Sequence, residues 1–145
     1  MRLSARVEYA AIAVLNIASH GDRHGPVSLK AICAEQEVPS RFLVHILLQL
    51  KRAGIVKSTR GAGGGYLLAK ATDAITLLDI YQAIEGPAES PAPVTAGLAV
   101  KSRAAAVLRK AWEAGCRARD ETLASFTLAD LIARTLNVNE PMYYI

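Results

Sequence analysis

The residues with the clearest chemical potential are the four glycines of segment 61–65 and the side chains that flank it. Arg60 precedes this segment and Tyr66 follows it. A tip without side chains can bring its backbone close to a sugar–phosphate chain, and Arg60 can enter a narrow minor groove. A P-loop would need Lys-Ser/Thr after its last glycine, and a dinucleotide fingerprint would need glycine at position 66. The segment therefore favours a DNA-contacting hairpin tip over a nucleotide site, with an ordinary surface hairpin as the alternative.

A second set of side chains shares one face of a helix that the sequence predicts to start at Pro39-Ser40, with Ser40 as its N-cap. The apolar stripe expected to face the core comprises Phe42, Leu43, Ile46, Leu47 and Leu50. This leaves Ser40, Arg41, Val44 and His45 pointing outward. Arg41 can bind guanine in a bidentate manner, Ser40 can donate to a phosphate or base, and His45 can bind a base or a phosphate. The alternative for each is a solvated surface residue.

The sequence contains little that could support catalysis or metal binding. Its three histidines are not at metal-ligand spacing with either cysteine. Cys33 falls on the inward side of an expected helix, as a small core residue would. Cys116 lies near Arg117 and Arg119, which could lower the pKa of its thiol, so a redox or metal sensor remains an alternative. We predict no enzyme activity and no cofactor.

Charge is distributed unevenly along the 145 residues. Residues 1–70 carry ten Lys/Arg against four Asp/Glu, whereas residues 71–145 carry seven against nine, so the halves have net charges of +6 and −2. A basic half of this kind is typical of a nucleic-acid-binding head. No apolar stretch reaches the roughly 18 residues needed to span a bilayer, and no signal peptide is recognised. We therefore expect a cytoplasmic protein that does not associate with membranes.

The expected elements of the first half follow the order of a winged helix–turn–helix. Ser4 caps a first helix that should end near His20, with Gly21 as its stop. Ser28 caps a second helix, and the third runs from Ser40 to Gly54. β-branched and apolar residues then predict strands over 55–60 and 66–69, joined by the glycine-rich tip. The predicted fold is mainly α with a small β-hairpin wing.

The second half predicts a scaffold rather than a site. Thr76 caps a short helix over 77–84, a long helix starts near Val100, and Thr127 begins a last one. The chain thus divides into a DNA-binding domain at 1–87, a loop at 88–99 and a helical dimerisation region at 100–145. The long helix has an apolar and small-residue face suited to close approach of another helix: Val107, Leu108, Ala111, Trp112 and Gly115.

Several segments together resemble the IscR/NsrR/CymR family of bacterial regulators. They are residues 1–4, 26–32, 50–56, 60–66, 75–80 and 83–86. The resemblance implies a homodimer in which the long C-terminal helices cross, with each wing and recognition helix docking on one half-site of a pseudo-palindromic operator. Half-sites would then lie about 34–36 Å apart or a multiple of that spacing.

The sequence departs from the family pattern at two places. Iron–sulfur members carry three clustered cysteines before the tryptophan, whereas residues 88–111 contain none, and the last ligand position falls near Ala106. Alanine cannot replace a thiolate ligand, so no family-type cluster is expected. In addition, Val44 stands where the iron–sulfur regulator has an acidic base-reading residue. Operator preference should therefore differ, for example through contact of Val44 with a thymine methyl group.

The sequence as a whole predicts a transcriptional regulator that binds double-stranded DNA as a homodimer, acts as a repressor and lacks an iron–sulfur cluster. The alternatives are control through a protein partner and sensing through Cys116. The predicted DNA-contacting residues are Arg2, Ser28, Lys30, Ser40, Arg41, Val44, His45, Lys57, Arg60, Gly61, Gly63, Gly64 and Tyr66.

Overall fold

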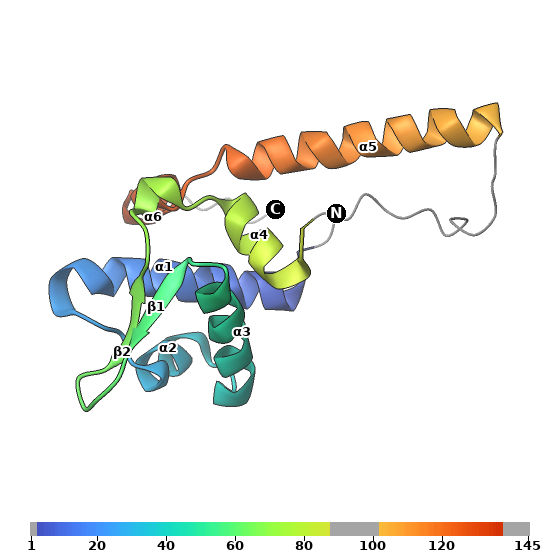
Figure 1. Cartoon of the computed structure of the whole chain (residues 1–145). Helices are drawn as coiled ribbons and strands as arrows, with labels where there is room; N and C mark the ends of the chain where they lie inside the picture. The colour runs from blue at the N-terminus through green and yellow to red at the C-terminus, as the bar shows by residue number, and fades with distance from the viewer. Residues whose placement is uncertain (1–2, 88–101, 138–145) are drawn as a thin grey trace.

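The computed structural model describes residues 3–87 and 102–137. Arg2 and the expected loop at 88–99 lie outside these ranges. In the described part, a head built from helices and a hairpin lies beside one long helix, α5, which extends along one side of the head and beyond it (Figure 1). The elements in order are α1 (Ala5–His24), α2 (Leu29–Gln36), α3 (Ser40–Arg52), β1 (Val56–Thr59), β2 (Gly65–Leu68), η1 (Thr72–Ala74), α4 (Leu77–Glu85), α5 (Arg103–Ala124) and α6 (Leu128–Leu136). The predicted fold class is confirmed.

Helix α1 begins as expected and ends later than expected. The Ser4 hydroxyl accepts a hydrogen bond from the Val7 amide at 3.3 Å and caps the helix. The helix continues through Gly21 to His24 and ends at Gly25, whose φ is 76°. One glycine inside a helix costs only about 1 kcal/mol, whereas a glycine with positive φ is a common helix end. Gly21 was therefore wrongly predicted as the stop.

The start of α3 also differs from the prediction. Pro39, not Ser40, occupies the N-cap position, and no side chain caps the helix there. The Pro39 carbonyl instead accepts hydrogen bonds from the amides of Phe42 at 3.0 Å and Leu43 at 3.4 Å. Proline suits this place because its ring presets φ and it has no N–H to leave unpaired. Ser40 is thus the first helical residue, and its hydroxyl caps nothing.

The two strands form an antiparallel hairpin that is anchored to the head. Lys57 pairs with Leu67 and Ser58 with Tyr66 in the hairpin register. The backbone of Tyr66 also pairs with Val27, just before α2, through N–O distances of 2.8 and 2.9 Å. This contact ties β2, close to the tip of the hairpin, to the chain just before α2.

A single core holds the head together, and α6 contributes to it. The core is formed by Val7, Ala10, Ala13, Val14, Ile17, Ala18, Val27, Ile32, Leu43, Ile46, Leu47, Leu50, Ile55, Val56, Ile75, Ile80, Ile84 and Leu128. The Leu128 amide donates to the Ile75 carbonyl at 2.8 Å, and Thr76 forms a β-bridge with Thr127. Helix α6, which the sequence placed in the dimerisation region, therefore packs as part of the head.

Helix α5 packs against the head through α4 and leaves much of its surface exposed. Ser102 caps its start by accepting from the Ala105 amide at 3.0 Å. Near its other end, the Arg119 guanidinium lies 5.1 Å from the centre of the Tyr81 ring of α4 and pairs with Asp120 at 2.7 Å. Among the described residues, no helix is long and apolar enough to cross a membrane.

Candidate nucleic-acid interface

The outward face of α3 carries the residues that the sequence singled out. Ser40, Arg41, Val44 and His45 are all exposed, with Val44 at 42%. Their exposure follows from the burial of Leu43, Ile46, Leu47 and Leu50 on the opposite side of the helix. The position of these side chains is therefore suited to contact with a partner outside the head.

Phe42 does not belong to the buried stripe of α3. Its side chain is 52% exposed, and the Arg41 guanidinium lies 5.0 Å from the centre of its ring. A cation over an aromatic face is favourable by about 0.5–1 kcal/mol at exposed sites. Phe42 was thus wrongly predicted as a core residue, because helical spacing alone places it at the edge of the stripe.

One exposed line of α3 also includes two residues that the sequence pattern did not identify. Arg41, His45, Leu48 and Arg52 are all exposed and follow one another at spacings of four, three and four. This spacing keeps them on one face of a helix. If the helical spacing of the exposed residues is extended beyond His45, it reaches Leu48, which is 42% exposed, and Arg52.

The glycines of the hairpin tip meet different structural demands. A Cβ on Gly64 would lie 2.4 Å from the Thr59 carbonyl oxygen, and a Cβ on Gly65 would lie equally close to the Val27 oxygen. Gly61 has a φ of 108°, a conformation that residues with side chains rarely adopt. Gly63 has open space around it and no such φ. The fold therefore explains three of the four glycines, and Gly63 remains as the one whose missing side chain the fold does not need.

The two faces of β1 are turned toward different surroundings. Lys51 of α3 donates a hydrogen bond to the Ser58 hydroxyl at 2.7 Å, which links α3 to β1. Side chains alternate along a strand, so Lys57 lies on the other face. There it lines a shallow hollow with Ile17 of α1 and Leu67 of β2. Lys51 and Ser58 could not be found by local pattern, because their contact joins two elements.

The other residues predicted to contact DNA differ in whether their side chains are available to a partner. Lys30 and Arg60 are exposed. The Ser28 hydroxyl accepts from the Ala31 amide at 3.1 Å as the cap of α2, which leaves its own proton to donate. The Tyr66 side chain is half-buried and packs against the core, so it anchors β2 to the head.

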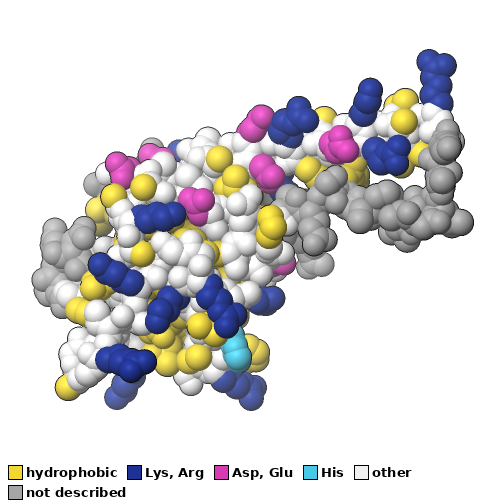
Figure 2. All heavy atoms as spheres, in the orientation of Figure 1, with side chains coloured by type: hydrophobic (Ala, Val, Ile, Leu, Met, Phe, Trp, Pro, Cys, Tyr) yellow, Lys and Arg dark blue, Asp and Glu magenta, His cyan; other side chains and the backbone are white. Residues whose placement is uncertain are grey.

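Basic side chains predominate on the part of the head that includes α2, α3 and the hairpin. In the face shown in Figure 2, most Asp and Glu side chains lie over α4, α5 and α6, whereas the part of the head that includes α2, α3 and the hairpin carries mainly Lys and Arg. The sequence asymmetry between the two halves thus becomes a spatial one. A surface of this sign attracts a phosphate backbone.

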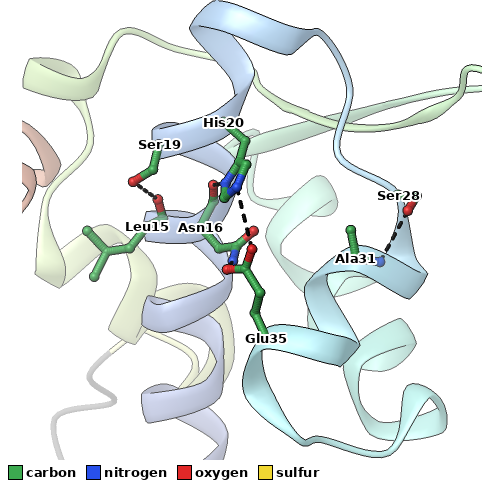
Figure 3. Close-up of polar contacts among 7 residues, drawn as sticks. All are labelled: Leu15, Asn16, Ser19, His20, Ser28, Ala31 and Glu35. Atoms are coloured by element: carbon green, nitrogen blue, oxygen red, sulfur yellow. Dashed lines mark hydrogen bonds and ion pairs between the residues drawn. The ribbon is translucent and has the colours of Figure 1, made fainter.

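A polar cluster braces α2 against α1 behind this surface (Figure 3). The buried Asn16 donates through Nδ2 to a Glu35 carboxylate oxygen. His20 lies 3.0 Å from the Asn16 carbonyl oxygen through Nδ1 and 3.4 Å from the Glu35 carboxylate through Nε2. Glu35 is thereby turned toward α1, and its contacts hold α2, the helix that precedes α3, against α1.

The free face of α5 is apolar in its first half. Val107, Leu108 and Trp112 are 62%, 67% and 61% exposed. Ala111 and Gly115 are exposed on the same helix. Large exposed hydrophobic patches mark interaction surfaces. No described residue covers this one.

Comparison with known proteins places the chain in a family. Residues 3–134 match the model of the Rrf2 family, described as an iron-dependent transcriptional regulator. The HTH-type transcriptional regulator CymR of Bacillus subtilis is 37% identical over 150 residues, covering 100% of both chains. An HTH-type regulator of Synechocystis is 44% identical over 85 residues, which span 59% of this chain and 57% of that protein. The structure of T. potens IscR matches with a TM-score of 0.78 and 30% identity, covering 99% of this chain and 95% of that one.

The residues of this chain do not fit an iron–sulfur cluster of the kind held by clustered thiolates. The sequence has two cysteines. Cys33 is half-buried on α2 and Cys116 is half-buried on α5, so they lie on separate elements. In residues 3–87 and 102–137, no group of three or more His, Cys, Asp or Glu side chains could hold a metal ion. Thiolates are the ligands on which such clusters depend.

Proposed function

The chain belongs to the Rrf2 family and is a DNA-binding transcriptional regulator, not an enzyme, and from this premise we propose that it represses transcription as a homodimer without an iron–sulfur cluster. The observation that carries the DNA-reading part is the link between α3 and the wing. The Lys51–Ser58 hydrogen bond holds the exposed face of α3 and the Arg60 tip in one unit. Two elements fixed to each other can meet adjacent grooves of one duplex.

Helix α3 supplies the base-reading residues in this proposal. Arg41 binds guanine through its two parallel N–H groups, and Ser40 donates to a base or phosphate. His45 binds a base acceptor or a phosphate one turn further on. Val44 gives apolar contact with a thymine methyl group, and its 42% exposure leaves the side chain available for that contact.

The wing and the helix starts supply backbone contacts. Arg60 enters the minor groove, while the tip residues Gly61, Gly63 and Gly64 allow the backbone to approach the sugar–phosphate edge. Phosphates are further contacted by the residues Arg2, Ser28, Lys30 and Lys57. Tyr66 supports the wing from behind. Such contacts position the protein and carry no sequence information.

Dimerisation is assigned to the free apolar face of α5. Residues Val107, Leu108 and Trp112 are each more than 60% exposed, and Ala111 and Gly115 allow close helix approach. Burying this face against a second copy removes it from water and pairs two DNA-binding heads at residues 1–87. The 100–145 region then serves as the dimer scaffold, with α6 also completing the head core.

The direct test is selection of duplex DNA from a random pool, followed by footprinting. We expect a pseudo-palindromic site whose half-sites are centred about 34–36 Å apart or a multiple of that. Arg41→Ala should relax base preference at one position in each half-site and weaken binding by about 1–3 kcal/mol. Arg134→Ala removes the same charge from α6 and should leave base preference unchanged. Failure to select any sequence would refute the proposal.

A further inference from the structure

A groove lies between the first turns of α1 and the length of α3. Its volume is about 760 Å3. The apolar side chains that line it include Tyr9, Phe42, Ile46 and Leu48, and the guanidinium groups of Arg6 and Arg52 and the imidazole of His45 line it as well. Small-molecule sites typically occupy about 300–1,000 Å3 and combine an apolar lining with a few polar groups. The groove has both the size and the composition of such a site.

The apolar lining is not accounted for by the core of the head. Ile46 is 3% exposed and forms part of that core, but Phe42 is 52% exposed and Leu48 is 42% exposed. Both side chains therefore remain in water on a helix whose other large apolar residues are mostly buried. Figure 2 shows hydrophobic side chains interspersed with Lys and Arg over α3. An apolar surface bordered by charge is typical of a ligand site.

The charged side chains in the described lining of the groove are positive. Among residues 3–87 and 102–137, Arg6 and Arg52 line the groove, no aspartate or glutamate does, and neither arginine forms an ion pair. Arg6 of α1 donates through Nη2 to the Gln49 side chain of α3 at 2.7 Å, which holds this guanidinium across the groove. Arginine presents a planar set of donors that matches a carboxylate. The groove is thus suited to an anion with an apolar body.

We propose that this groove binds a small organic anion with an aromatic or branched apolar body, and that the bound anion displaces DNA from α3. The proposal rests on the proposed DNA-reading role of α3. His45 lines the groove and also belongs to the outward face that meets the duplex. Ligand and DNA therefore compete for one surface, which makes the anion an inducer of a repressor.

A second copy of the chain fits the groove less well than an organic anion does. The projecting half of α5 carries three exposed cations, Arg103, Arg109 and Lys110, against one exposed carboxylate, Glu113, so its net charge is positive. Placing that segment in the groove would bring these cations toward Arg6 and Arg52. Like charges in a partly desolvated contact are unfavourable.

The test uses 1-naphthoate as the anionic probe and 1-naphthamide as its uncharged analogue, titrated calorimetrically into the full chain. We expect saturable naphthoate binding that is at least tenfold tighter than naphthamide binding. Leu48→Ala should weaken naphthoate binding at least threefold. The matched control is Ile12→Ala, which truncates an isomeric side chain that is 41% exposed and does not line the groove. Saturating naphthoate should also lower affinity for the selected duplex at least threefold.

Several results would overturn the inference. These are no saturable naphthoate binding, equal binding of the amide, an equal effect of Ile12→Ala, and unchanged duplex affinity in the presence of naphthoate. A monomeric Leu48→Ala chain beside a dimeric Ile12→Ala chain would assign the groove to a second copy instead. Duplex binding measured without a probe tests the proposed function separately. Selective duplex binding without naphthoate binding would therefore contradict the ligand proposal and leave the proposed function intact.

Discussion

The glycines at the tip of the wing differ in what the backbone requires of them. Gly64 is needed because the backbone of Thr59 passes close to it, and Gly61 is needed for its φ. Gly63 meets neither demand. The sequence showed only that glycine is abundant here, since the demand on each one depends on which backbone atoms approach it. Gly63 is therefore the tip glycine that we expect to be required for contact with DNA and not for the fold.

A pair of alanine substitutions separates these cases. Gly64→Ala places a Cβ 2.4 Å from the Thr59 carbonyl oxygen, so the hairpin backbone must shift. We expect the free energy of unfolding to fall by about 1–3 kcal/mol, as for other overpacked sites. Gly63→Ala adds the same methyl group in open space and should change it by less than about 0.5 kcal/mol. Urea denaturation of both variants measures the difference, and equal losses would contradict the structure.

A second prediction at this scale concerns the two cations of the wing. Arg60→Gln should weaken duplex binding and make the plot of log affinity against log salt less steep by about 0.9, the value for one phosphate contact. Lys57→Gln removes the other proposed phosphate contact of the hairpin strands, so its effect on the slope should be of similar size. Arg134→Gln removes the same charge from α6 and should leave the slope unchanged. Binding isotherms at several salt concentrations measure the three slopes. Identical slopes for Arg60→Gln and the parent chain would remove Arg60 from the interface.

At the scale of elements, the sequence predicted every helix and strand that positions α3 and the wing, because apolar period and capping residues are local signals. Two helix ends differ from the prediction. α1 passes through Gly21 because one glycine inside a helix costs only about 1 kcal/mol, and α3 has Pro39 rather than Ser40 at its N-cap. The Val27–Tyr66 bridge joins distant segments, and the Lys51–Ser58 bond joins a helix to the strand that follows it. No local pattern contains that information.

Helix α6 offers a test of capping that is sensitive to pH. The Thr127 hydroxyl and amide donate to the Asp130 carboxylate, at 2.7 and 3.0 Å, and these hydrogen bonds hold the pKa of Asp130 below its usual value. A folded-state pKa below the unfolded one means that the carboxylate stabilises the fold above the unfolded pKa. This stabilisation is lost as pH falls through the folded pKa, so below about pH 4.

We therefore expect Asp130→Asn to lower the Tm at pH 7 and to reduce the further loss of Tm between pH 5 and pH 3. The substitution removes the titrating carboxylate while keeping a side chain of similar shape. Asp73→Asn removes an exposed carboxylate from η1 and serves as the control. Thermal unfolding followed by circular dichroism gives the comparison. A parent chain and an Asp130→Asn chain with parallel pH profiles would show that this cap contributes nothing.

At the scale of the whole molecule, α5 leaves an apolar surface without a partner in the described chain. The core of the head is formed within one chain and includes Leu128 of α6. Helix α5, in contrast, contacts α4 and projects its first half beyond the head (Figure 1). Stability and assembly are thus assigned to different surfaces, which allows one to be altered without the other.

Trp112→Glu tests this separation. The side chain is 61% exposed, so a charge there should leave the thermal unfolding of the head nearly unchanged while preventing burial of the α5 face against a second copy. We expect a monomer by analytical ultracentrifugation. Affinity for the selected duplex should fall by about 10²–10⁴, because two linked heads bind with a gain in avidity of this order.

The control is Leu136→Glu, which introduces the same charge at a 77% exposed apolar position of α6 and should remain dimeric. A Trp112→Glu chain that stays dimeric and binds as tightly as the parent would place the dimer contact elsewhere. Monomeric chains that keep full affinity would instead show that one head suffices, and the paired half-sites would then need another cause.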